Sequence, residues 1–551
     1  MPTESTALPT EPGTETETKA GAGTGTKAEA EAKTGTETGA EASGRMEHRR
    51  VIEALTGLLL AMLTAFLSST IVSNALPTII RDLHGSQRQY TWVITAALLA
   101  STASTPIWGK LSDLVSKKLL VQLAIGVFTA GSVLAGFAQS MDVLIVWRVV
   151  QGLGLGGLQS LVVIVIAAMI SPRERGRYSG PIAAVMSVAT VAGPLLGGVI
   201  VDTSWLGWRW CFFVCVPLAV LSALVVQRTL NLPVVRRRVR IDYWGAALIT
   251  AGVSVLLIWV TLAGSEFAWG SGTSFALAGA GVVLLALAVW VESRVAEPII
   301  PLRLFADRTT ALATVAGIAV GTALFGGAVF LGQYFQIARG YSPTAAGLLT
   351  LPMIIGSVLS STLSGILITR LGRWKAFLVV GSALMVAGFG LLGTIDHTTD
   401  MVLLGAFLFV LGVGMGMTMQ NLVLAVQNTV APADLGAASS TVAFFRSLGG
   451  TVGVSVLGAI LAGRVGTLTT QGLADAGIPA GSGGAGIGSL DQLPPAVATI
   501  VRTAYGDATA TILLVAAVLS IATVVCVAAI REVPLRTQSG TQRLAGERAA
   551  V

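Results

Sequence analysis

Long runs of residues without a formal charge recur along this chain and constrain its fold more than any other feature. One of them, Gln89–Gly109, is long enough as a helix, at about 1.5 Å per residue, to cross the roughly 30 Å of hydrocarbon in a bilayer. Only 11% of the 551 residues are charged, whereas a soluble globular domain has about 25%. The sequence therefore predicts an all-α polytopic membrane protein and excludes an ordinary soluble enzyme.

Counting these runs predicts fourteen transmembrane helices, arranged as six, two and six. The even number places both ends of the chain on the same side of the membrane. Lys and Arg concentrate in every second loop, which identifies that side as the cytoplasm. The predicted spans are residues 54–80, 89–109, 119–141, 143–172, 178–201, 210–227, 243–265, 267–291, 309–338, 340–369, 376–395, 401–433, 435–463 and 508–530.

The same pattern divides the chain into parts. Residues 1–50 are rich in Thr, Glu, Gly and Ala and are expected to form a disordered cytoplasmic tail. We expect a multi-pass protein of the cell (plasma) membrane, and the abundance of Gly, Ala and Arg indicates a bacterial source. The remaining predicted parts are an N-terminal six-helix bundle (51–230), two inserted helices with a basic linker (231–300), a C-terminal six-helix bundle (301–531) that contains a long outer loop (464–507), and a second cytoplasmic tail (532–551).

A short loop of mixed charge follows the second predicted span. A glycine ends the span, where it would let two helix ends approach, and one acid then stands among three bases: Gly109, Lys110, Asp113, Lys117 and Lys118. A weaker copy, GILITRLGRWK, occupies residues 365–375 in the second half. Internal repeats are typical of transporters that rock two halves about a central site. We therefore expect the loop to act as a latch at the cytoplasmic face.

This loop resembles the one between the second and third helices of the major facilitator superfamily of secondary transporters. Ser116 stands where the family pattern has its second glycine, and Lys117 where it has arginine. The resemblance implies that Asp113 and the lysines gate transport. A simpler alternative is that Lys117 and Lys118 only fix the orientation of the chain, but that alternative does not account for Asp113.

Arg148 lies inside the fourth predicted span, where a charge costs at least about 2.5 to 3.5 kcal/mol on insertion scales. It needs a partner or a wet cavity, unless it only extends to the outer interface. With Gln151 and Gly152 it matches the superfamily pattern R-x-x-Q-G, which implies a role in coupling substrate movement to protonation. Arg446 in the thirteenth span is predicted to belong to the same machinery.

The fifth predicted span contains the sequence VAGPLLGGV. Pro194 removes a helix hydrogen bond and should kink the helix, while Gly193 and Gly197 should let a neighbouring helix pack backbone to backbone. Together with Gly198, these residues resemble a signature that the exporters of the superfamily carry and its importers usually lack. The resemblance implies outward transport.

The first predicted span contains LSSTIVSNALPTI and resembles the branch of fourteen-span drug:proton antiporters, also called multidrug or antibiotic efflux permeases. That branch has an aspartate where this chain has Ser68, and no Asp or Glu remains in the interior of any predicted span. A substrate cavity near the midplane would therefore be lined by neutral polar groups. The candidates are Ser68, Asn74, Gln159, Gln333, Gln336 and Gln420.

The function predicted from these features is efflux of hydrophobic small molecules, such as antibiotics, driven by the proton gradient through alternating access. Without a membrane-embedded acid, the cavity suits neutral or anionic compounds. Proton coupling would then use an acid at the end of a helix, such as Asp142 or Asp202. A facilitator or solute importer of the same fold is the alternative, and a polytopic membrane enzyme is a less favoured one.

No catalytic residues, metal or cofactor are expected, and the proton gradient would supply the energy. The chain has no phosphate-binding G-x-x-x-x-G-K-[ST] motif of an ATP-driven pump. Cys211, Cys215 and Cys526 lie in apolar runs and are interpreted as small buried side chains. The expected partners are a hydrophobic small molecule, protons and the lipid bilayer. No nucleic acid is expected, and the protein is expected to be a monomer.

Overall fold

The structure is a computed structural model that describes residues 48–84, 87–175, 178–203, 205–232, 242–264, 266–295, 297–341, 343–478 and 494–538. Most of the predicted tail 1–50, the basic stretch 233–241, the middle of the predicted outer loop and the end of the chain from 539 lie outside these residues. Within them the chain is helical, and its one β feature is an isolated bridge between Ala263 and Phe267. The all-α class is confirmed.

Every predicted span contains a helix or a pair of short helices. The long helices are α2 (His48–Asp82), α3 (Gln87–Leu114), α4 (Lys117–Gly136), α5 (Met141–Met169), α7 (Ser179–Asp202), α9 (Cys215–Thr229), α10 (Tyr243–Leu262), α11 (Gly272–Glu292), α12 (Arg308–Gln333), α14 (Leu351–Leu371), α15 (Lys375–Leu392), α16 (Met401–Thr429), α17 (Leu435–Asp475) and α18 (Pro495–Ala529). The short ones are α6 (Pro172–Arg175), α8 (Trp210–Phe213), α13 (Pro343–Leu349), the 3-10 turns η2 (Leu302–Ala306) and η4 (Pro432–Asp434), and the π-helical turn η3 (Tyr334–Ala338).

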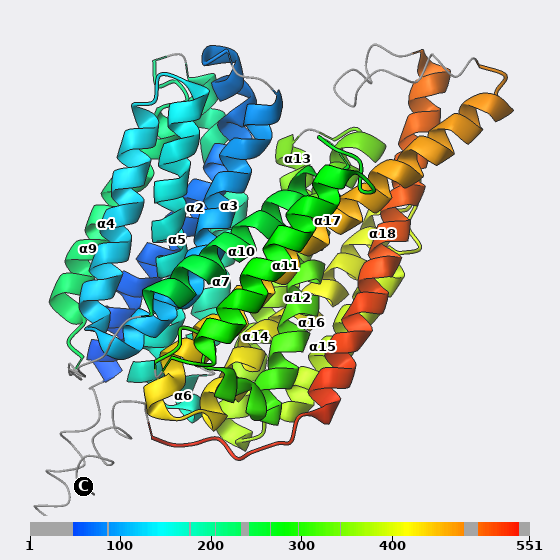
Figure 1. Ribbon diagram of the computed structural model, residues 1–551. Helices are drawn as coiled ribbons and strands as arrows, with labels where there is room; N and C mark the ends of the chain where they lie inside the picture. The colour runs from blue at the N-terminus through cyan, green and yellow to red at the C-terminus, as the bar shows by residue number, and fades with distance from the viewer. Residues whose placement is uncertain are drawn as a thin grey trace, which may run out of the picture. The chain divides into compact units, whose positions relative to one another are not determined.

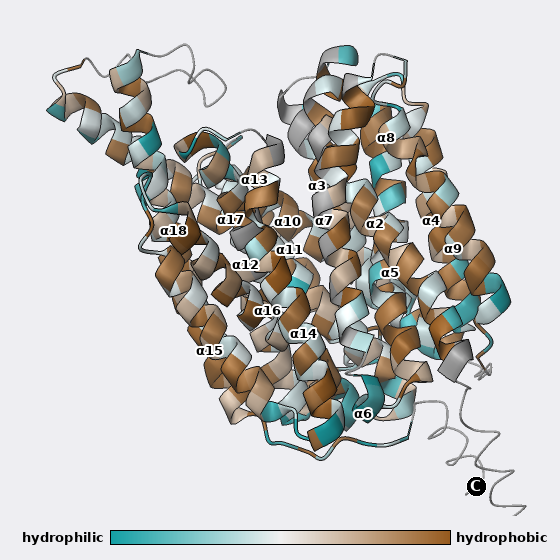
Figure 2. Cartoon of the chain, turned by 180° about the vertical axis from the view of Figure 1, so that it is seen from behind, coloured by the Kyte–Doolittle hydropathy of each residue, from teal (hydrophilic) through white to brown (hydrophobic). Residues whose placement is uncertain are grey.

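The protein is a multi-pass membrane protein. Eleven of the described helical segments are long and apolar enough to cross a bilayer, and the total of fourteen stays a prediction. Large apolar side chains such as Val146, Val199 and Val518 are exposed, as expected of a surface that faces lipid. Figure 2 shows hydrophobic residues along the lengths of the helices and hydrophilic residues gathered around α6.

Several spans begin at a polar residue that caps the helix. The Asp307 carboxylate accepts a hydrogen bond from the Thr310 amide at the start of α12, at 3.0 Å. The Asp400 carboxylate does the same for the Val402 amide at the start of α16, at 2.9 Å. Such caps satisfy backbone donors that have no partner within their own helix. They explain why acids stand at the ends of the spans.

The predicted outer loop 464–507 is shorter in the structure than the sequence indicates. Helix α17 continues to Asp475, and α18 already begins at Pro495. Arg464 and Asp507 bounded the two uncharged runs here, and both lie within helices. The first charged residue therefore did not mark the end of either helix.

The helices form two sets with the same internal packing. In the first set (α2–α9), α3 and α4 pack on α5, and in the second set (α12–α18), α14 and α15 pack on α16 in the same way. Figure 1 shows the first set in blue and cyan beside the second set in green to red. We call the surface along which they meet the seam; there α3 contacts α17, and α7 contacts α14.

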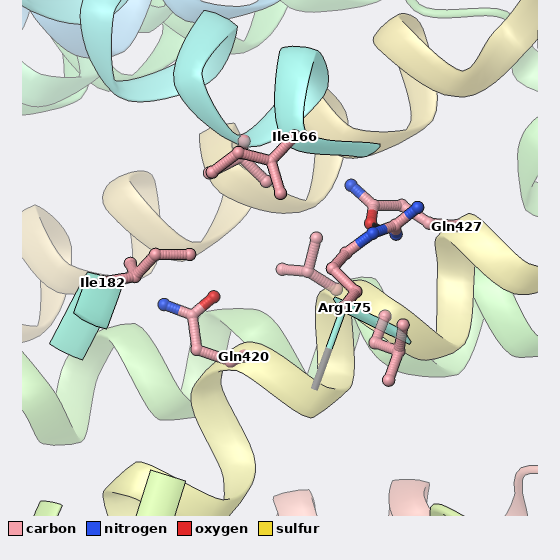
Figure 3. A pocket seen from close by; sticks show the side chains of 8 residues that line it. Ile166, Arg175, Ile182, Gln420 and Gln427 are labelled. Carbon is pink, nitrogen blue, oxygen red and sulfur yellow. Dashed lines mark hydrogen bonds between the residues drawn. The ribbon is translucent and has the colours of Figure 1, made fainter. Parts of the chain in front are cut away.

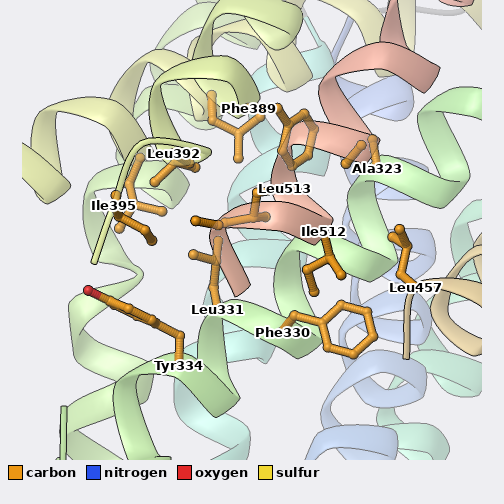
Figure 4. Packing of buried hydrophobic residues seen from close by; sticks show 14 of the residues in the cluster. Ala323, Phe330, Leu331, Tyr334, Phe389, Leu392, Ile395, Leu457, Ile512 and Leu513 are labelled. Carbon is orange, nitrogen blue, oxygen red and sulfur yellow. The ribbon is translucent and has the colours of Figure 1, made fainter. Parts of the chain in front are cut away.

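A hydrophobic core fills the second set away from the seam. Phe330 and Leu331 of α12 pack there with Phe389 of α15 and Leu513 of α18, all almost fully buried (Figure 4). The phenol of Tyr334 lies at the edge of this core and donates a hydrogen bond to the Asp396 carbonyl at 2.6 Å. Close packing of this kind makes the set resist internal deformation.

The inserted pair α10 and α11 packs along the seam (Figure 1). Its apolar cluster joins Ile249 and Val253 of α10 to Leu99 of α3 and Phe444 of α17. The pair therefore contacts α3 of the first set and α17 of the second set, and these two helices also contact each other.

Candidate gating and transport site

Asp113 lies in the last turn of α3 and contacts the first turn of α17 across the seam. Its Oδ1 accepts a hydrogen bond from the Gly436 amide at 2.9 Å, and its Oδ2 accepts one from the Ala437 amide at 2.8 Å. These amides have no acceptor within their own helix, and the helix dipole favours a negative charge at this position. The predicted latch residue thus joins two segments that are far apart in the sequence.

Two glycines let the backbones approach closely enough for this contact. A Cβ on Gly109 would overlap the Ser440 side chain, and a Cβ on Gly436 would overlap Ser112 and Asp113. The sequence identified Gly109 as the point of approach. Gly436 was missed, because a glycine at the start of a helix has no distinguishing signal until its partner is known.

The three predicted lysines have three different partners. Lys110 Nζ forms an ion pair with Glu297 Oε2 at 2.7 Å, and Lys110 is buried whereas Glu297 is partly exposed. Lys117 donates to the Ser112 carbonyl at 2.9 Å, and Lys118 donates to the Gln227 carbonyl at 2.6 Å. Glu297 follows α11, so the Lys110 pair connects the inserted helices to the end of α3 that carries Asp113.

Burial and the neighbouring groups act in opposite directions on the pKa of Asp113. Burial raises the pKa of the Asp113 carboxyl from 3.8 to about 7, while Lys117, the two α17 amides and Lys110 act in the opposite direction. The carboxyl at the seam can therefore gain or lose a proton near neutral pH, which an exposed aspartate cannot do.

Arg148 is buried inside the first set rather than extended to an interface. Its Nε donates to the Val93 carbonyl at 3.1 Å, and its guanidinium donates to Gln151 Oε1. The Gln151 amide in turn donates to Ser68 Oγ at 3.1 Å and to the Ser132 hydroxyl. This network brings together predicted residues from α2 and α5, and in the described part of the chain the partners of the arginine are all neutral.

Arg446 lies on α17 at a position where α12 comes very close. A Cβ on Gly321 of α12 would overlap the Arg446 carbonyl. The residue as a whole is half-buried, and its guanidinium forms no ion pair with the described residues. Arg446 therefore does not join the Arg148 network, although both were predicted to serve one mechanism.

Gly193 provides a close contact between α7 and α2. A Cβ on Gly193 would overlap Thr70 Oγ1 of α2, and that hydroxyl donates to the Ala189 carbonyl of α7 at 3.0 Å. Gly197 is buried and Gly198 is half-buried, and α7 runs as one helix through Pro194. A Cβ on Gly193 would also lie 3.3 Å from the Ile71 backbone nitrogen, so the glycine accommodates both the Thr70 side chain and the backbone of α2.

A small cavity lies between the two sets near α6. Its polar lining consists of Arg175 of α6 with Gln420 and Gln427 of α16 (Figure 3). The apolar lining comes from α5, α7 and α16 and consists of Val163, Ile166, Ile182, Val423 and Leu424. Gln420 was a predicted cavity residue. Arg175 was missed, because an arginine in a charged loop is expected to face water.

The other predicted cavity residues are dispersed. Gln159 is half-buried on α5. Gln333 accepts a hydrogen bond from Tyr505 Oη at 2.8 Å, and Gln336 is exposed in η3. The side chain of Asn74 lies outside the described residues. None of these is among the residues that line the cavity in Figure 3.

Comparison with known proteins decides the family. Residues 58–454 match the family model described as Major Facilitator Superfamily. The chain belongs to this superfamily. The match covers well over half of the chain, so the resemblance inferred from the charged loop and the span motifs is confirmed.

Similar members of the superfamily include transporters named for drugs. Multidrug transporter protein MdtP of Bacillus subtilis is 34% identical over 428 residues, which is 78% of this chain and 78% of the relative. An uncharacterized MFS-type transporter of Mycobacterium tuberculosis is 38% identical over 486 residues, 87% of this chain and 69% of the relative. The crystal structure of the human organic anion transporter MFSD10 (TETRAN) has a TM-score of 0.57 at 15% identity, covering 86% of this chain and 100% of that one, and shows the fold alone.

In this superfamily member, replacing Asp113 by Asn should reduce transport at least tenfold while the protein stays in the membrane. An asparagine side chain cannot ionise. Its NH2 group would face one of the two backbone N–H donors, so that hydrogen bond would be lost. A hydrogen bond to a charged group is worth about 1.5–3 kcal/mol. Cellular export and the amount of protein in the membrane fraction measure the two effects. Asp475→Asn, exposed at the other end of α17, is the control. Normal export by Asp113→Asn would contradict a latch role.

Closure of the seam at Asp113 should weaken as the pH rises from about 4 to 7. The closed contact has a pKa of about 7, whereas an exposed aspartate has one of about 3.9, so a proton binds more tightly to the closed form. Protonation of Asp113 therefore stabilises the closed form fully below a pH of about 4, and this stabilisation is lost as the pH rises through about 7. Distances between spin labels at Val115 and Ala431 should lengthen accordingly in the wild type. A pH response that persists in Asp113→Asn would assign it to another group.

Gly193→Leu should stop export by preventing closure between α2 and α7. The added side chain would displace Thr70, and overpacking of this kind costs about 1–3 kcal/mol. Gly126→Leu in α4 is the matched control, because nothing lies within 4 Å of a Cβ there. The Gly193→Leu variant should lose export but should still bind substrate in an equilibrium binding assay. If the Gly193 variant exports normally, or fails to insert at all, the glycine has no role in closure.

Proposed function

We propose that this protein exports hydrophobic small molecules, such as antibiotics, by alternating access coupled to the proton gradient. The observation that supports the proposal is the Asp113 contact, which closes one end of the seam through a carboxyl that titrates near neutral pH. Relatives whose names describe drug export support the same conclusion. One is Multidrug resistance protein 3 of Bacillus subtilis, 33% identical over 404 residues.

In this proposal the α6 end of the protein faces the cytoplasm, as do both ends of the chain. The parts that move are the two bundles predicted at 51–230 and 301–531, and the Asp113 contact must open for the substrate to enter from the cytoplasm. The inserted pair would steady the gate through the Lys110–Glu297 ion pair. The role of Arg148 and Gln151 would be to couple the first set to this motion.

The proposed substrates are neutral or anionic. A lipophilic cation near the midplane needs a nearby carboxylate, because desolvating an unpaired charge costs several kcal/mol. The interiors of the predicted spans contain no acid and hold Arg148 and Arg446 instead. Asp113 is half-buried at the seam, whereas Asp142, one of the two predicted proton carriers, is exposed and accepts a hydrogen bond from Gln89 at 2.8 Å. The side chain of the other predicted carrier, Asp202, lies outside the described residues. We therefore favour Asp113 as the proton carrier.

The alternative is a facilitator or importer of the same fold, which the lack of an acid within the spans favours. It differs from the proposal in one measurable respect, because its flux would not respond to an imposed pH gradient. The exporter motif at Gly193–Gly198 favours the proposal instead.

Vesicles containing the purified protein, with a pH gradient imposed across them, provide the test. Uptake of neutral and anionic aromatic drugs should rise at least severalfold with the gradient and disappear with a protonophore. Permanently charged quaternary ammonium dyes should not be transported. Strong transport of those dyes alone would refute the charge argument, and gradient-independent flux would favour the facilitator.

A further inference from the structure

Arg175 is a buried cation without a carboxylate partner among the described residues. Its side chain donates to the Ala167 and Ile170 carbonyls, each at 3.0 Å, and to Gln427 Oε1. The Nε–H has no acceptor in the described part of the chain. Burial lowers the pKa of Arg175 to about 9, which leaves the group charged at neutral pH. A buried charge held only by neutral groups remains incompletely compensated.

The surroundings of Arg175 combine this charge with an apolar wall. Ile166 of α5 and Ile182 of α7 line the cavity on one side of the seam, and Val423 and Leu424 of α16 line it on the other. A few polar groups within an apolar lining are typical of small-molecule sites. The site therefore matches a lipophilic molecule that carries a negative charge at one end.

The position of the cavity relates it to the latch. Gln427 accepts from Arg175 and donates to Ser439 Oγ of α17 at 2.8 Å. Ser439 lies in the same first turns of α17 whose amides bind Asp113. An anion at Arg175 would compete with Gln427 for the guanidinium. A shift of Gln427 would then disturb its hydrogen bond to Ser439, next to the turn of α17 that binds Asp113.

We propose that Arg175 binds the anionic group, a carboxylate or phosphate, of a lipophilic molecule that enters between the two sets of helices, with its apolar body against Ile166, Ile182, Val423 and Leu424. This inference rests on the proposed export function and adds the charge of the substrate and the residue that selects it. In the closed state the cavity is small and holds only the charged end. The rest of the molecule would follow when the seam opens.

The test compares a lipophilic aromatic carboxylic acid with its methyl ester. The full-length protein is placed in phosphatidylcholine vesicles with an imposed pH gradient. Arg175→Gln should raise the KM for the acid at least tenfold and leave the ester unchanged, and Arg175→Lys should restore part of the acid transport because it keeps the charge. Arg173→Gln is the matched control, since Arg173 is an exposed arginine of the same short helix.

Three results would overturn the inference. Equal loss of acid and ester transport in Arg175→Gln would show that the arginine only holds the gate, and no loss of either would show that it selects nothing. A loss confined to vesicles that contain phosphatidylglycerol would assign the anion to a lipid headgroup.

Equilibrium binding of the radiolabelled acid to the purified protein separates this inference from the proposed function. The wild type should bind the acid, and Arg175→Gln should bind it at least tenfold more weakly. If the wild type binds the acid with this dependence but does not transport it, the export proposal fails and the site stands. If the wild type does not bind the acid, the site fails.

Discussion

A contact between one carboxylate and two backbone amides joins the two sets of helices at the α6 end, and the account of gating depends on it. Asp113 supplies the acceptors that the first turn of α17 lacks, and glycines on both helices bring the backbones close enough for it to reach them. The inserted pair packs against the same two helices. A contact of this kind can form or break as a unit, because each carboxylate oxygen is paired with a donor fixed in a helix.

Buried charge is the second constraint on the structure. Arg148 and Arg175 are both buried, and within the described residues both donate to backbone carbonyls and to a glutamine side-chain oxygen instead of to acids. Such groups accept hydrogen bonds without cancelling the charge, so each arginine keeps a positive potential in a low-dielectric region. This positive potential is the physical basis of our proposal that the substrates are neutral or anionic rather than cationic.

The sequence predicted the helical class and the position of nearly every long helix, because uncharged length is a local signal. An acid among bases is also a local signal, and it singled out Asp113, whose role as a latch stays a prediction. The sequence could not predict partners that are distant in the chain. Gly436, Glu297 and Gln427 acquire their roles only through contacts across the seam. Arg175 shows the limit most clearly, since burial of a loop arginine depends on tertiary packing. The outer loop was overestimated because a helix can continue beyond the membrane.

The central claim is that the Asp113 carboxylate holds the first turn of α17, and hydrogen exchange of that turn tests it most directly. Deuterium uptake by a peptide that spans residues 434–440 should be slow in the wild type and at least tenfold faster in Asp113→Ala, which removes both acceptors. A peptide from the middle of α17 should exchange equally slowly in both proteins. Equal exchange of the 434–440 peptide in the two proteins would contradict the account.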